Sequence, residues 1–62
     1  MLEQELEGMS VLVVDDNATA RDIMRTTLES MGFRVDTVRS GEEAISRCLL
    51  QTYEVALIDW KM

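Results

Sequence analysis

Three aspartates stand where two apolar runs of the chain end. Asp15 and Asp16 directly follow the run 11–14, and Asp59 directly follows the run 55–58. Carboxylate oxygens suit a hard cation such as Mg²⁺, which also binds phosphate oxygens, so clustered aspartates favour phosphoryl chemistry. An aspartate can itself be the nucleophile and form an acyl phosphate. We expect Asp59, alone at its strand end, to be this nucleophile, and Asp15 and Asp16 to hold the metal.

Each aspartate also has a purely structural explanation, because Asp is common in turns and at helix N-termini. Taken singly, any one of the three fits a turn or a cap. Two apolar strands that both end in Asp favour a shared site instead, provided that the fold brings the strand ends together. The elements between them therefore decide the question.

Hydrophobic patterning predicts five elements in the order β-α-β-α-β. The apolar runs 10–15 and 54–58 are typical of strands buried on both faces of a parallel sheet. The segment 33–38 is more polar and partly alternating, which is typical of an edge strand. Apolar residues at helical spacing predict helices over 18–31 and 41–51.

Local signals mark the ends of both helices. Asp16 or Asn17 is expected to cap the first helix, and Gly32 is expected to end it in the left-handed conformation. Ser40 and Glu43 fit a capping box, in which each side chain accepts a hydrogen bond from the backbone N–H of the other residue.

Each helix has an apolar stripe that is expected to pack on the sheet. The stripe of the first helix comprises Ala20, Ile23, Met24, Leu28 and Met31. The stripe of the second helix comprises Ala44, Ile45, Cys48 and Leu49. Cys48 is therefore expected to be a buried, unreactive thiol, and Arg21 and Arg25 are expected on the solvated face of the first helix.

The order of the strands follows from handedness and polarity. Crossovers between parallel strands are right-handed. With 33–38 at an edge, the fold is an α/β three-stranded parallel sheet of order 2-1-3 with one helix on each face. The direction of the connections then reverses at the first strand, and open α/β sheets bind ligands at such a switch point. Asp15, Asp16 and Asp59 all fall in that crevice.

Composition excludes several function classes. The net charge is −6, which argues against a nucleic-acid partner, because binding phosphates requires a basic surface. The chain has no histidine and a single cysteine, so it has neither a zinc ligand set nor an internal disulfide. No apolar run approaches the ~20 residues of a membrane span, and the acidic start is not a signal peptide. We expect a linker or helix tail at 1–9, no membrane contact and a cytoplasmic location.

Over residues 10–62 the motifs resemble the first half of a response-regulator receiver domain. The resemblance is carried by VLVVDDN at 11–17, SGEEA at 40–44 and ALIDWKM at 56–62. The last motif is particularly similar to the receivers inside hybrid sensor histidine kinases. A receiver has a flavodoxin-like fold, of which this chain would form half.

The resemblance also implies a function in two-component, or phosphorelay, signal transduction. Asp59 would accept a phosphoryl group from a phosphohistidine of a histidine kinase or histidine phosphotransfer domain. Mg²⁺ would be held by Asp15, Asp16, Asp59 and the backbone carbonyl of Lys61.

The chain departs from the family pattern in one respect. A full receiver has a five-stranded sheet of order 2-1-3-4-5, and the residues that sense the phosphoryl group follow the third strand. We therefore expect a truncated receiver domain at 10–62 that cannot complete the switch and is not an independent enzyme. A hybrid histidine kinase is one candidate for the parent protein.

Two other functions stay open. An uncovered apolar edge at 54–58 is a liability in a sheet, so the chain is alternatively a self-associating structural fragment, a homodimer joined through that edge. The other alternative is a Mg²⁺-dependent aspartyl phosphohydrolase. Haloacid-dehalogenase-type enzymes have Asp-x-Asp after their first strand, whereas Asp15 and Asp16 are adjacent. A nucleotide-binding fold is weaker still, because no Gly-rich loop follows the first strand.

Overall fold

The computed structural model describes residues 8–59, and in this range it contains the five predicted elements in the predicted order. The strands are β1 (Ser10–Val14), β2 (Arg34–Val38) and β3 (Val55–Ile58). The helices are α2 (Ala18–Ser30) and α3 (Gly41–Leu50). The observed ends lie within a residue or so of the predicted ones.

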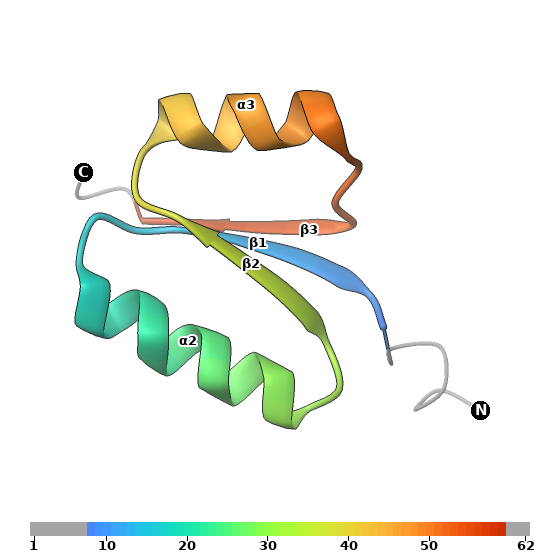
Figure 1. Ribbon diagram of the computed structural model, residues 1–62. Helices are drawn as coiled ribbons and strands as arrows, with labels where there is room; N and C mark the ends of the chain where they lie inside the picture. The colour runs from blue at the N-terminus through green and yellow to red at the C-terminus, as the bar shows by residue number, and fades with distance from the viewer. Residues whose placement is uncertain (1–7, 60–62) are drawn as a thin grey trace.

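The three strands form one parallel sheet of order β2-β1-β3, as predicted. Val11 lies opposite Val35 on one side and Val55 on the other. Helix α2 lies against one face of this sheet and α3 against the opposite face (Figure 1). β1 is therefore paired along both edges and covered on both faces, which makes it the centre of the fold.

The core is β1 itself, together with one residue of β2. Val11, Leu12, Val13 and Val14 are each at most 2% exposed. On the α3 face, Leu12, Val14 and Val38 form one cluster, against which Ala44 and Tyr53 pack. Full burial of a Val or Leu side chain contributes ~1.5–3 kcal/mol, so this one strand supplies much of the hydrophobic stabilisation.

The end of α2 and the strand that follows it are fixed by a glycine turn. Gly32 has a φ of 98°, a conformation that disfavours any side chain. Its N–H donates to the carbonyl of Glu29, and the N–H of Phe33 donates to the carbonyl of Leu28. These two bonds form a Schellman motif, and the predicted role of Gly32 is confirmed.

The predicted capping box at the start of α3 is only half formed. Ser40 Oγ accepts a hydrogen bond from the N–H of Glu43 at 3.2 Å, as expected. The Glu43 carboxylate instead accepts from the N–H of Arg39, one residue before the cap. The Glu43 side chain therefore ties the loop before the helix to its first turn.

The predicted burial of the helical stripes is largely wrong. Ile23 and Met24 of α2 are exposed, and so is Met31, the residue that caps its C-terminus. In α3, Ile45, Cys48 and Leu49 are exposed. The physical reason is that both helices pack on β1 and β2, and within residues 8–59 neither lies over β3. Three of the five residues of the first stripe and three of the four residues of the second are therefore exposed, and Cys48 is not the buried thiol that its position suggested.

β3 has the apolar sequence of a buried strand but not its environment. Val55, Ala56 and Ile58 are exposed, and only Leu57 is half-buried. The prediction that 54–58 is buried on both faces is therefore wrong for the described residues. The strand is held by its ladder to β1 and by the segment that leads into it.

The contrast between β1 and the helical surfaces gives a first prediction. Leu12→Ala removes a side chain that is 1% exposed, whereas Leu49→Ala removes one that is 82% exposed. Leu12→Ala is expected to lower the free energy of unfolding by ~2–5 kcal/mol, and Leu49→Ala by less than ~0.5 kcal/mol. Urea unfolding followed by circular dichroism measures both, and equal losses would contradict this description of the core.

Candidate functional site

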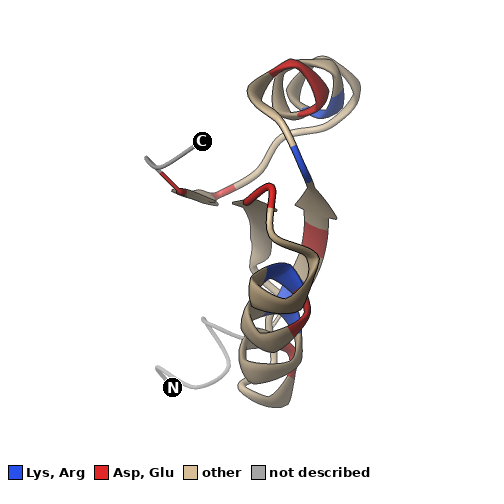
Figure 2. Ribbon diagram, turned by 90° about the vertical axis from the view of Figure 1, so that its left-hand side faces the viewer, with Lys and Arg blue, Asp and Glu red and all other residues tan. Residues whose placement is uncertain are grey.

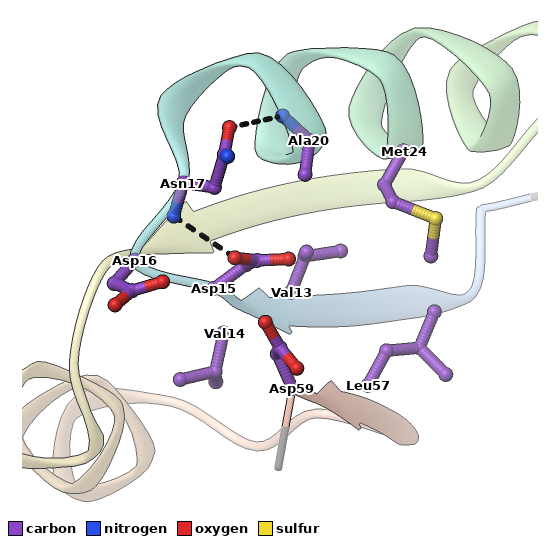
Figure 3. A pocket seen from close by; sticks show the side chains of 9 residues that line it. All are labelled: Val13, Val14, Asp15, Asp16, Asn17, Ala20, Met24, Leu57 and Asp59. Carbon is purple, nitrogen blue, oxygen red and sulfur yellow. Dashed lines mark hydrogen bonds between the residues drawn. The ribbon is translucent and has the colours of Figure 1, made fainter. Parts of the chain in front are cut away.

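The carboxylates of Asp15, Asp16 and Asp59 meet at the carboxyl ends of β1 and β3. One carboxylate oxygen of each residue lies within 4.8 Å of those of the other two. Figure 3 shows Asp59, at the end of β3, facing the two aspartates that follow β1. The crevice at the switch point therefore brings together the residues that the sequence placed there.

Backbone ladders fix two of the three aspartates. The N–H of Asp15 donates to the carbonyl of Val38 at 3.1 Å, and the N–H of Asp59 donates to the carbonyl of Val14 at 2.9 Å. Each bond continues the parallel pairing by one residue past the strand end. Asp15 and Asp59 thus start from rigid positions, and both are half-buried, whereas Asp16 is exposed.

The turn between β1 and α2 is closed by its own polar side chains. Asp15 Oδ1 accepts a hydrogen bond from the N–H of Asn17 at 2.9 Å. Asn17 Oδ1 accepts from the N–H of Ala20 at 3.0 Å, so Asn17 rather than Asp16 is the helix cap. Asp16 is left to project beside the crevice (Figure 3).

Arg21 is a contributor to the site that the sequence did not reveal. It was expected on the solvated face of the helix, but its Nη1 donates to the backbone carbonyl of Asp15 at 2.7 Å, and the contact is partly buried. The spacing of six residues between a turn aspartate and a helical arginine is the only signal in the sequence, and it does not distinguish this contact from a solvated side chain.

The three carboxylates border an open hollow of about 570 Å³ on the α2 side of the sheet. Val13, Met24 and Leu57 form its apolar wall (Figure 3). The hollow is large enough for a small ion with its waters and a phosphoryl group. Acidic residues, red in Figure 2, mark the turn after β1 that forms its rim.

The three carboxylates of the site repel one another when all are ionised. Two unit charges about 5 Å apart repel by roughly 3 kcal/mol at an effective dielectric constant of ~20, and by less than ~1 kcal/mol in water. Because Asp16 is exposed to solvent, its repulsion with Asp15 and with Asp59 is closer to the value in water. A divalent cation would relieve the repulsion, and an all-oxygen donor set of carboxylates fits a hard ion such as Mg²⁺.

A second polar cluster, on the α3 face, anchors the segment that leads into β3. Asp36 Oδ2 accepts hydrogen bonds from Gln51 Nε2 at 2.8 Å and from the hydroxyl of Tyr53. Arg47 Nη1 lies 4.0 Å from the same oxygen. Burial, and then the hydrogen bond to Asp36, raise the pKa of Tyr53 above its ordinary value of 10.0. Because β3 contacts neither of the helices in residues 8–59, this cluster helps to determine where Asp59 lies.

The comparison with protein families identifies the domain. The family profile of the response regulator receiver domain matches residues 11–62. The chain belongs to the receiver-domain family. The resemblance found in its motifs is thus confirmed, and the three-stranded sheet is part of a flavodoxin-like receiver fold.

Curated relatives of this receiver domain include response regulators and sensor kinases. The transcriptional regulatory protein ResD of Bacillus subtilis is 38% identical over 84% of this chain and 22% of its own length. The sensor protein EvgS of Escherichia coli K12 is 30% identical over 90% of this chain and 5% of its own. A probable histidine kinase 5 of rice, Oryza sativa, is 47% identical over 76% of this chain and 4% of its own.

The chain spans less than a quarter of the length of each of these relatives. No solved structure gives a significant match. Neither helix among the described residues has the length and apolar character needed to cross a membrane. Lys61, whose carbonyl the resemblance assigns to a metal, and its neighbour Trp60 lie outside the described residues.

The raised pKa of Tyr53 gives a second prediction, for the variant Tyr53→Phe. The variant is expected to lose about 1 kcal/mol of stability at pH 7, because the hydrogen bond to Asp36 is removed. The folded-state pKa lies above the unfolded one, so the contribution of the phenol is fully present below about pH 10 and is lost as pH rises through the raised value.

The measurement is the urea midpoint of wild type and Tyr53→Phe from pH 7 to pH 11. The difference between the two proteins is expected to be constant up to about pH 9.5 and to shrink above pH 10. A difference that stays constant through pH 11 would show that the phenol does not stabilise the fold through its proton.

Proposed function

We propose that this receiver domain accepts a phosphoryl group from a phosphohistidine onto Asp59 in a phosphorelay. The observation that carries the proposal is the meeting of the Asp15, Asp16 and Asp59 carboxylates at one strand-end crevice. The donor would be a histidine kinase or a histidine phosphotransfer domain. The names of the relatives, among them a sensor protein and a histidine kinase, support this partner class.

We assign the nucleophile to Asp59, and the positions of the three aspartates support this choice. Asp15 already accepts a backbone hydrogen bond on Oδ1, and its neighbour Asp16 belongs to the same turn. Asp59 follows the other strand, β3, and its carboxylate faces those of Asp15 and Asp16. A carboxylate oxygen of Asp59 would attack phosphorus; the new O–P bond forms as the P–N bond to imidazole breaks, and the leaving nitrogen takes a proton.

The negative charge of the incoming phosphoryl group makes a cation necessary at this acidic crevice. Asp15, Asp16 and Asp59 supply the oxygens that would hold Mg²⁺, and the resemblance adds the carbonyl of Lys61. Bound there, the ion would neutralise charge on the transferred group. The contribution of this chain is to hold the acceptor carboxylate of Asp59 in a partly buried position beside the hollow.

We propose further that residues 10–62 form the acceptor part of the switch and do not produce the output by themselves. In the resembled family, the groups that sense the phosphoryl group follow the third strand. The partial coverage of every reported relative is consistent with this division. The response of the whole protein would then depend on segments outside this chain.

The third prediction tests the acceptor. Phosphoramidate has the P–N bond of phosphohistidine, so incubation with it is expected to add one phosphoryl group in the presence of Mg²⁺ and none in the presence of a chelator. Intact-mass spectrometry measures the addition. Asp59→Asn is expected to abolish it, and Asp15→Asn to slow it at least about tenfold.

Two controls complete the experiment. Asp22→Asn removes a carboxylate from the exposed face of α2 and is expected to leave labelling unchanged. The acyl phosphate is labile at high pH, so label on Asp59 is lost after mild base treatment, whereas a phosphoserine or phosphothreonine survives it. Labelling that persists in Asp59→Asn would refute the assignment.

A second function is favoured by β3: self-association of this chain as a homodimer. β3 pairs with β1 along one edge, and within residues 8–59 no strand pairs with its other edge. Val55 is 37% exposed and Ile58 51% exposed on this strand. An apolar, unpaired edge is a template for another strand. We propose that two copies join β3 to β3 and form a six-stranded sheet.

The fourth prediction tests the dimer by light scattering. The chain is expected to show the mass of two copies at high concentration, and Val55→Lys is expected to restore the mass of one. Ile45→Lys, on the exposed side of α3, is the matched control and is expected to remain dimeric. A folded monomer at every concentration would exclude the dimer without affecting the phosphoacceptor proposal.

A further inference from the structure

We infer that Arg21 is a positioning residue for the phosphoacceptor site, which it serves by holding the turn that carries Asp15 and Asp16. The effect of Arg21 on the site's function rests on the proposed function. Its effect on the geometry of the turn does not. The bond that carries it runs from Arg21 Nη1 to the carbonyl oxygen of Asp15, at 2.7 Å.

Asp15 is held at three of its polar groups. Its N–H donates to Val38, its Oδ1 accepts from Asn17, and its carbonyl accepts from Arg21. The first bond fixes the strand end and the second fixes the rotation of the side chain. The third is the only one of these that reaches Asp15 from the body of α2, so it sets the orientation of the turn against the helix.

Arg21 is placed to couple the first turn of α2 to the end of β1. Its backbone N–H donates to the carbonyl of Asn17 at 3.0 Å and closes the first turn of the helix. Its side chain reaches back past the cap to Asp15. The backbone of Arg21 therefore fixes the helix side of this turn and its side chain fixes the strand side. Asp16 projects from the turn beside the crevice.

The guanidinium also contributes its charge. Among the described residues, ion pairs are formed by Arg25, Arg39 and Arg47. Arg21 is in none of them, because it binds a carbonyl group and not a carboxylate. It thus places a positive charge beside the acidic turn without occupying a carboxylate oxygen that a cation would need. A residue that neutralised Asp15 directly would compete with that cation.

Arg25, one helical turn after Arg21, provides a control. Comparing variants of the two arginines distinguishes the positioning role from a general effect of charge or helix propensity. Arg25 bridges Asp22 and Glu29 on the surface of α2, away from the turn. Arg21→Gln and Arg25→Gln remove the same charge from the same helix. Only the first removes a hydrogen bond to the site.

The fifth prediction has two measurements on the full chain. In the absence of Mg²⁺, amide hydrogen exchange at Asn17 is expected to accelerate in Arg21→Gln and to stay unchanged in Arg25→Gln, because the Asn17 N–H is bonded to Asp15 Oδ1. Then, in a Mg²⁺ titration followed by the fluorescence of Trp60, the single tryptophan, Arg21→Gln is expected to bind at least about tenfold more weakly. Arg25→Gln is expected to match wild type.

Arg21→Lys provides the rescue, since it keeps the charge and one donor, and its affinity is expected between those of wild type and Arg21→Gln. Circular dichroism confirms that each variant is folded, and if Arg21→Gln is not, Arg21→Lys takes its place in both measurements. If wild type binds no Mg²⁺ while Asn17 exchange still accelerates, the proposed function fails and the positioning role stands. Unchanged exchange, or unchanged Mg²⁺ affinity in a wild type that binds, overturns the role of Arg21.

Discussion

The structure depends on the pairing of β1 along both of its edges. This strand is the only element that contacts every other one, and its four apolar residues are almost fully buried. Because the two flanking strands are parallel to it, all three strands end on the same side of the sheet. The meeting of Asp15, Asp16 and Asp59 follows from that single arrangement. No loop has to fold over to bring the carboxylates together.

The same arrangement concentrates negative charge at the carboxyl ends of β1 and β3. The carboxylates repel one another, and the ion pairs of Arg25, Arg39 and Arg47 go to carboxylates elsewhere in the chain. What holds them is the backbone: ladder bonds at Asp15 and Asp59 and the Arg21 bond to the turn. At Asp15 these are bonds with backbone N–H and carbonyl groups and not with another carboxylate. Holding the turn in this way keeps Arg21 off the carboxylate oxygens that a cation would need.

Features that follow from the hydrophobic pattern and the turn residues could be predicted from the sequence. Whether another element covers a given surface could not. Strand order, the glycine turn at Gly32 and the convergence of the aspartates were predictable, because apolar runs, handedness and turn chemistry are local or topological rules. The burial of Cys48 and Leu49 was predicted wrongly, because a helical stripe shows which face is apolar and not whether anything covers it. The contacts of Arg21 and Glu43 were missed for a different reason. Several rotamers of a long polar side chain fit the same sequence, and only the packed turn selects one.

The weakest part of the site is Asp59, and the reason lies in β3. Asp15 stands on a strand supported on both edges, whereas Asp59 stands on one that is paired only to β1 within the described residues and has no helix over it. Its position is secured by the ladder bond to Val14 and, at the other end of the strand, by the Tyr53 anchor to Asp36. Any strand that pairs with the outer edge of β3 would therefore also support the position of Asp59. By linkage, if pairing of that edge changed the affinity of the crevice for a ligand, the ligand would change the strength of the pairing by the same factor. The acidic crevice and the outer edge of β3 thus share one strand, which is the structural route by which they could be coupled.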